Sequence, residues 1–294
     1  MTRPVRLAVA AVLTPVLGVM LAGCPSPSPG PTSSSAPTPT PPGPSATGGA
    51  TGGPGGGSTA LLAIYYTLAD RGTPKLVREF HRLPVAADTA TAKATAAVKE
   101  MLRPSALDSD YKTLWPTSAT VRGVSVSGDV TTVDLSGVST GNVGAIGEAQ
   151  AVQQLVWTVT AATGLPQVQI KRDGKVVESL WGHVTVDKPL RRAAAADTLH
   201  AVWVIAPQHG ERTGGDVTVH LAGIVFEATV NYDVLQGGTV VKHGVVTLDP
   251  GRPAQGEAKV TVRLAPGTYV IQAYEVSAKD GSRLHIDNHT FTVA

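Results

Sequence analysis

The sequence predicts an α+β region followed by an all-β sandwich. Two observations predict this fold class. Residues 60–187 alternate strand-like hairpins with two helical segments, and residues 197–294 contain strand-like runs about ten residues apart. The alanine-rich segment 188–196 separates them, and we expect it to act as a hinge rather than as a helical continuation. Each region has a size that is usual for one domain.

The N-terminus has the pattern of a secretory signal. Arg3 and Arg6 precede an apolar run that ends in Leu21, Ala22, Gly23 and Cys24. The run is about 15 residues long, short for a membrane span of roughly 20. Cys24 is the only cysteine in the chain. An ordinary signal peptide or one transmembrane helix, each with a chance cysteine, is the alternative.

This pattern resembles a bacterial lipoprotein signal. The resemblance implies that residues 1–23 are removed and that Cys24 becomes a diacylglyceryl cysteine on the outer face of the cell membrane. Two acyl chains anchor a protein stably, whereas one chain holds it only marginally. Residues 25–59 contain ten prolines, nine glycines and no charged side chain, so we expect 24–59 to be the lipid anchor and a disordered tether.

The charge distribution argues against nucleic acid as a partner. The formal net charge is +2, and Arg3 and Arg6 leave with the signal. Twelve basic and twelve acidic residues remain in 60–187, and ten of each in 188–294. A nucleic-acid-binding protein should have a basic patch, and a neutral balance in both halves does not predict one.

The elements of 60–187 follow from periodicity and turn signals. We expect strands at 61–66 and 75–83, then a helix capped by Asp88 or Thr89 and stopped by Pro104, with Ala90, Ala94, Ala97 and Met101 on one face. A hairpin at 121–126 and 130–135 precedes a helix at 145–162, and strands at 167–171 and 175–180 follow. The second helix should bury a stripe of five residues: Ile146, Ala149, Val152, Val156 and Val159.

An ordered set of motifs in this region resembles the GerMN domain, which is named from a sporulation and spore-germination protein. The motifs are Val133-Asp134-Leu135-Ser136, Glu148, Gln154 to Thr158, Val168 to Ile170 and Asp173-Gly174. The resemblance implies a helix-on-sheet domain involved in envelope processes such as sporulation or germination. Asp134, Glu148 and Thr158 match family positions, and we expect their roles to be structural.

Residues 197–294 predict a β-sandwich of immunoglobulin type. The strand-like runs are 199–205, 216–222, 225–235, 239–248, 257–264, 268–277 and 283–293. Pro266-Gly267-Thr268-Tyr269 could form a tyrosine corner. Val202-Trp203-Val204, Pro207, Gly223, Phe226-Glu227-Ala228 and the segment 275–282 resemble the immunoglobulin-like domain of bacterial spore germination. In that family this domain commonly follows GerMN. Glu227, Asp280 and Gly281 are family positions with expected structural roles.

Catalytic and metal sites are weakly indicated. No motif nominates a Ser or Cys nucleophile with its base. Asp134 and Glu148 are the best pair of carboxylates for a wall hydrolase, although strand and helix ends also favour them. His285, Asp287 and His289 alternate along a strand and could share zinc, but same-side residues are about 6.5–7 Å apart. The other histidines are scattered (81, 183, 200, 209, 220 and 243), and Trp157 is the tryptophan expected to be partly exposed to a partner.

These observations favour a non-catalytic envelope lipoprotein without cofactors, whose two domains are interaction modules. Its expected partners are the membrane, through Cys24, and an envelope protein or peptidoglycan. A lipoprotein that binds a cell-wall glycan or peptide is the alternative, and a wall hydrolase is the least favoured.

Overall fold

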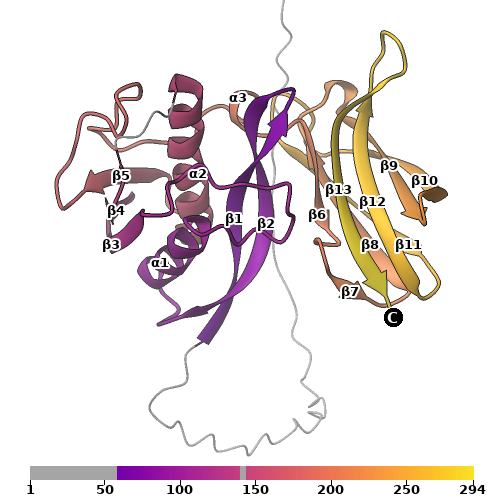
Figure 1. The fold of residues 1–294 in the computed structure, drawn as a ribbon, viewed down its shortest axis with the longest axis horizontal. Helices are drawn as coiled ribbons and strands as arrows, with labels where there is room; N and C mark the ends of the chain where they lie inside the picture. Colours follow the sequence, from indigo (N-terminus) through magenta and orange to yellow (C-terminus); the bar gives the residue numbers. More distant parts are fainter. Residues whose placement is uncertain (1–57, 140–143) are drawn as a thin grey trace, which may run out of the picture. The chain divides into compact units, whose positions relative to one another are not determined.

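Strands make up most of the regular structure in this computed structural model, which describes residues 58–139 and 144–294 (Figure 1). The predicted combination of many strands with a few helices is confirmed. The described residues all belong to one compact unit. The predicted signal, Leu21, Ala22, Gly23, Cys24 and most of the tether lie outside the described residues. No helix in the described part of the chain is long and apolar enough to span a membrane.

The chain first forms a long antiparallel hairpin of β1 (Ser58–Asp70) and β2 (Thr73–Val85). Arg71 and Gly72 make its turn with φ of 50° and 81°. The two strands extend beyond the predicted ranges because their ends continue the same register from Asp70 opposite Thr73 to Ser58 opposite Val85.

The helix α1 (Ala90–Met101) begins as predicted. Its N-cap is Thr89, whose hydroxyl accepts a hydrogen bond of 3.2 Å from the Ala92 amide. Ala94, Ala97 and Met101 are buried on the predicted face.

A three-stranded sheet contains β3 (Thr120–Ser127), β4 (Val130–Ser136) and β5 (Gln167–Arg172) in that order. β4 and β5 are parallel, and α2 (Ala145–Thr163) makes the crossover that a parallel pair needs. The helices contact each other, the β1–β2 hairpin and this sheet (Figure 1).

The predicted apolar stripe of α2 is wrong at its first turn. Ile146 and Ala149 are exposed, whereas Val152, Val156 and Val159 are buried. Later in the helix, side chains are buried on nearly every side because α2 contacts α1, β1, β2 and β5. Helical periodicity does not show how many neighbours surround a helix.

The predicted strand at 175–180 is also wrong. Asp173 and Gly174 form the expected turn, with φ of 52° and 82°, but only Lys175 bridges back to Arg172. The chain then forms a loop in which the Ser179 hydroxyl and the amides of Trp181 and His183 bond to Glu148.

The remaining strands form two sheets of a sandwich. One has the order β10-β9-β12-β13-β7 and the other β11-β8-β6. Their bounds are β6 (Val202–Ala206), β7 (Arg212–Thr213), β8 (Asp216–Gly223), β9 (Thr229–Gln236), β10 (Thr239–Thr247), β11 (Gly256–Arg263), β12 (Gly267–Val276) and β13 (Arg283–Val293). The predicted strand 225–235 starts late because the 3₁₀ turn η1 (Phe226–Ala228) precedes β9. The tyrosine corner is present, since the Tyr269 hydroxyl donates to the Ala265 carbonyl at 2.9 Å.

Strand β6 is buried on both faces. Val202 and Val204 belong to the core between the two sheets, whereas Trp203 and Ile205 belong to the core of the N-terminal α+β region. The end of β8 alternates in the same way, with Leu221 in the sandwich and Ala222 on the other side. This double burial explains the continuous apolar run in β6.

The linker is fixed by contacts, which differs from the hinge that we expected. The Arg192 guanidinium donates to the Thr160 hydroxyl at 2.6 Å and lies 4.3 Å from the ring centre of Trp157. The Ala193 amide donates to Gln153 at 2.8 Å, and the short α3 (Ala195–Thr198) follows. Arg192 thus covers Trp157, which is only 5% exposed, and the predicted exposure of this tryptophan is wrong.

Candidate functional site at the junction of the two regions

Glu148 is a fully buried carboxylate that holds the loop after β5. It accepts hydrogen bonds from the Ser179 hydroxyl at 2.8 Å, the Trp181 amide at 3.1 Å and the His183 amide at 2.8 Å. Burial alone would raise the pKa of Glu148, but these hydrogen bonds outweigh it and the pKa lies below its ordinary value. The carboxylate therefore stays ionised, and its oxygens already accept hydrogen bonds from the loop. This state does not suit a general acid, which must hold a proton to donate.

Asp134 and Thr158, the other two family positions of this region, bond to the chain around them. Asp134 accepts from the Gly174 amide at 2.9 Å and pairs with Arg122 at 3.3 Å. Thr158 accepts from the Tyr65 amide at 3.2 Å and so joins α2 to β1. None of these contacts makes Asp134 and Glu148 face each other as a catalytic pair.

Asp280 and Gly281 form the turn between β12 and β13. Asp280 accepts from the amide and hydroxyl of Ser282 at 3.1 and 2.7 Å, and Gly281 has a φ of 73°. Glu227 lies in η1 with a φ of 58°, a left-handed conformation that is uncommon for residues other than glycine.

The predicted zinc residues of β13 contact separate groups. A register shift in the pairing with β12 lies next to His285, which itself has a φ of 53°. His285 pairs with Asp70 at 2.9 Å. Asp287 and His289 instead bond to the hydroxyl of Tyr111, at 2.8 and 3.1 Å.

Tyr111 inserts from the α+β region into the edge of the sandwich. Asp287 also accepts from the Val204 amide at 2.7 Å, and His289 contacts the Pro207 carbonyl at 2.9 Å. Burial and the neighbouring Asp287 carboxylate raise the pKa of Tyr111 well above its ordinary value, so the hydroxyl remains a donor. One tyrosine thus connects β6 and β13 to the loop that follows α1.

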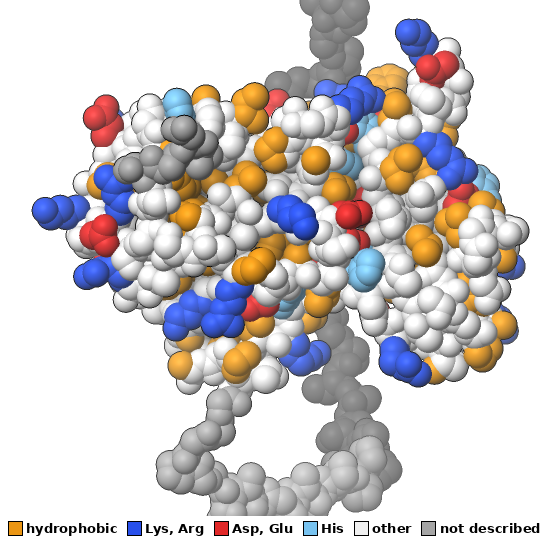
Figure 2. All heavy atoms as spheres, viewed as in Figure 1, with side chains coloured by type: hydrophobic (Ala, Val, Ile, Leu, Met, Phe, Trp, Pro, Cys, Tyr) orange, Lys and Arg blue, Asp and Glu red, His pale blue; other side chains and the backbone are white. Residues whose placement is uncertain are grey.

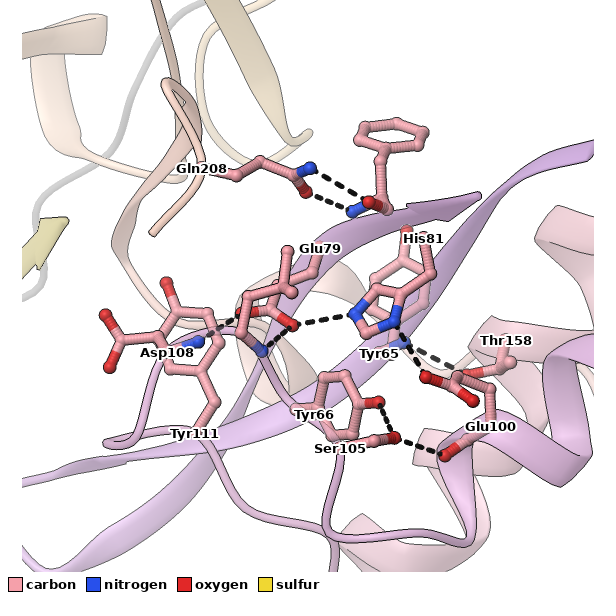
Figure 3. Close-up of polar contacts among 12 residues, drawn as sticks. Tyr65, Tyr66, Glu79, His81, Glu100, Ser105, Asp108, Tyr111, Thr158 and Gln208 are labelled. Carbon is pink, nitrogen blue, oxygen red and sulfur yellow. Dashed lines mark hydrogen bonds and ion pairs between the residues drawn. The ribbon is translucent and has the colours of Figure 1, made fainter. Parts of the chain in front are cut away.

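A second buried polar network lies beside Tyr111 (Figure 3). Glu79 accepts from the amides of Leu107 and Asp108 at 2.9 and 2.8 Å, and His81 bridges Glu79 and Glu100 at 2.9 Å on both sides. Burial would lower the pKa of His81, but the two carboxylates outweigh it and raise the pKa. His81 therefore keeps its proton to a higher pH than an ordinary histidine does.

Direct bonds between the two regions continue along this junction. Gln208 bonds to both the amide and the carbonyl of Phe80, at 2.5 and 2.9 Å (Figure 3). Asp108 pairs with His209 at 2.9 Å. Arg78 pairs with Glu257 at 2.7 Å, and His220 contacts the same carboxylate at 2.7 Å. The junction is therefore extensively hydrogen-bonded.

A pocket opens at one end of the junction. Asp70 and Lys75 line it from the hairpin, and Phe226, Glu275 and His285 from the sandwich. Phe226 is the most exposed large hydrophobic residue described, at 74%. Glu227 and Ala228, with φ of 58° and 54°, directly follow it. Backbone strain of this kind often marks functional positions, so this pocket is the candidate binding site.

Two models of known protein families match these two regions. Residues 63–178 match Germane, described as sporulation and spore germination, and residues 201–282 match Gmad2, the immunoglobulin-like domain of bacterial spore germination. The chain carries a Germane domain followed by a Gmad2 domain. The predicted family resemblance is confirmed for both. No curated protein matches the chain significantly.

Solved structures resemble parts of the chain at low identity. The tandem GerMN domains of the sporulation protein GerM from Bacillus subtilis are 15% identical, with a TM-score of 0.38, and the match covers 48% of this chain and 47% of that chain. The first GerMN domain of the same protein is 20% identical, with a TM-score of 0.35, and the match covers 45% and 98%. A candidate lipoprotein from Clostridium perfringens is 17% identical, with a TM-score of 0.34, and the match covers 46% and 88%.

The sequence did not indicate the residues that join the Germane and Gmad2 domains. Tyr111 and Asp108 lie far in sequence from their partners in the sandwich, and nothing in their local pattern differs from surface polar residues. The one available signal was the unbroken apolar run of β6, because such a run predicts burial on both faces.

Proposed function

We propose that this chain is a lipid-anchored, extracytoplasmic protein of the sporulation and germination type that binds an envelope protein through its joined Germane and Gmad2 domains. The observation that carries the proposal is the junction itself, where the buried hydrogen bond of Tyr111 and the half-buried hydrogen bonds of Gln208 join the two domains. The lipid anchor is supported by the signal-like pattern of the N-terminus, in which Leu21, Ala22 and Gly23 directly precede Cys24.

A role without catalysis is supported by the state of the carboxylates. Glu148 is fully buried and accepts three hydrogen bonds, and Asp134 is held by Gly174 and Arg122. The helix contacts of α1 and α2 with the strands support a helix-on-sheet layout for the Germane domain. Acidic and basic side chains are interspersed on the face drawn in Figure 2, which suits a protein partner better than nucleic acid.

The partner surface in this proposal is centred on Phe226. An exposed aromatic beside a pocket with charges of both signs is the kind of anchor that protein interfaces use. The anchored chain would present this surface at the distance from the membrane that residues 24–59 allow.

The test is crosslinking in cells with a photoreactive phenylalanine analogue at position 226. The matched control carries the analogue at Val245 on β10, which is 56% exposed. We expect a discrete protein adduct at 226 that is absent at 245. Adducts with wall peptide or glycan fragments alone would support the wall-ligand alternative, and identical patterns at both positions would contradict a partner site at Phe226.

A further inference from the structure

Three side chains with metal-binding groups meet at the pocket end of the junction. Asp70 is the last residue of β1, His200 lies between α3 and β6, and His285 lies near the start of β13. One donor atom of each lies within 4.8 Å of the others. They come from three separate segments and from both domains, so no sequence motif could have indicated them together.

The separations are close to those that a bound ion needs. An ion with nitrogen and oxygen ligands at about 2.0–2.1 Å brings tetrahedral ligand atoms to about 3.4 Å from one another. His285 and Asp70 are already 2.9 Å apart. The rings of His200 and His285 lie 6.0 Å apart between centres and nearly perpendicular, at 85°. Small side-chain rotations would therefore complete the set.

The surroundings orient His200 as a ligand. Its Nδ1 contacts the carbonyl of Val202, which can only accept, and the Val202 amide lies farther from the same nitrogen, at 3.4 Å. The shorter contact favours the tautomer with the proton on Nδ1 and the lone pair on Nε2. Metal-binding histidines are commonly held by a carbonyl at their other nitrogen in this way. His200 is 1% exposed, so the ring cannot turn freely into solvent.

The pocket supplies access for the ion and for a water ligand. Glu275 also lines it, but its carboxylate lies 3.7 Å from Nε2 of His285, whereas Asp70 faces Nδ1 of the same ring. Lys75 also lines the pocket, but its ammonium group donates to the Asp197 carbonyl at 2.5 Å. Arg252 is the other positively charged residue that lines the pocket, and its charge would repel a bound cation.

We propose that Asp70, His200 and His285 bind one divalent transition-metal ion of the zinc type, with water as the fourth ligand. Two imidazoles and a carboxylate form a donor set that zinc and cobalt accept and that magnesium and calcium do not favour. Asp70 belongs to the Germane domain, whereas His200 and His285 flank the residues matched to Gmad2, before β6 and in β13. The ion would therefore join the α+β region to the sandwich. The inference goes beyond partner binding and does not depend on it.

The test uses the full-length chain, purified in detergent without a histidine tag and treated with chelator. Calorimetric titration with Zn²⁺ should show one ion per chain, and Co²⁺ should give the intense visible absorption of a tetrahedral site. Asp70→Asn and His285→Gln should each weaken binding at least about tenfold. His243→Gln is the matched control, since His243 is exposed on β10 and pairs with Asp233.

Variant folding is checked by the melting temperature in chelator, and the Co²⁺ spectrum of the unchanged chain tests the site without any substitution. A Co²⁺ spectrum like that of the hydrated ion would overturn the proposal. Equal loss of Zn²⁺ affinity in Asp70→Asn and His243→Gln would overturn it as well, because binding would then not be localised at the junction.

Discussion

The hydroxyl of Tyr111 donates a buried hydrogen bond of 2.8 Å to the carboxylate of Asp287, 176 residues further along the chain. The same carboxylate accepts from the Val204 amide, so Asp287 joins β6, β13 and the Germane domain. A buried carboxylate needs such donors, because leaving it unpaired is costly.

Replacing Tyr111 with phenylalanine should therefore destabilise the chain. Tyr111→Phe retains the ring but leaves Asp287 and His289 without the hydroxyl, and we expect a loss of about 2 kcal/mol in the free energy of unfolding. Urea denaturation measures it. Tyr66→Phe is the control, because that hydroxyl only contacts Ser105 at 3.3 Å. Equal losses in both variants would contradict a special role for Tyr111.

The network around His81 should make stability depend on pH. The folded pKa of His81 is raised above 6.5, so its contribution is fully present below about pH 6.5 and is lost as pH rises through the folded pKa. Unfolding of the wild type and His81→Gln, compared at about pH 6 and pH 9, should differ more at the lower pH. A difference independent of pH would mean that His81 is not protonated between Glu79 and Glu100.

The ion pair between the domains should respond to acid. His220 and Arg78 lower the pKa of Glu257 from 4.5 to about 2, despite the opposing effect of burial. Its contribution is therefore present above about pH 4.5 and is lost as pH falls towards 2. We expect Glu257→Gln to cost on the order of 1 kcal/mol at neutral pH, since the group is partly exposed, and less near pH 3.

A matched control for Glu257→Gln is Asp216→Asn, whose carboxylate pairs with Arg263 on the exposed surface. Thermal denaturation of both variants across pH should show a clear effect for Glu257 alone. A similar effect at Asp216 would place the acid response in general surface charge rather than in the junction.

Glu148 should control the loop that replaces the sixth predicted strand of the Germane domain. Glu148→Gln puts an amide donor where backbone amides of Trp181 and His183 also donate, and the expected loss is about 2 kcal/mol. Hydrogen exchange should become faster at residues 179–184. Asp134→Asn is the control. Asp134 is another family position but is less buried and bonds to the Gly174 amide, so hydrogen exchange at residues 179–184 should be unchanged in this variant.

Much of the fold could be predicted from local sequence because local physics determines it. The cap at Thr89 and the corner at Tyr269 depend on residues within four positions, and both are found. Other features depend on residues far away in sequence: the bulge at His285, the contact of Arg192 with Trp157 and the loop held by Glu148. The candidate metal ligands likewise come from distant segments, so only His285 belongs also to the set predicted from the sequence, His285, Asp287 and His289.

The double burial of β6 sets an order of events as the chain is made from its N-terminus. Trp203 and Ile205 complete the hydrophobic core of the Germane domain, yet they emerge only after all of that domain has been synthesised. Until then one side of the core faces solvent, open to chaperones and proteases. A chain that terminates before β6 would therefore lack part of the hydrophobic core of the Germane domain as well as the whole Gmad2 domain.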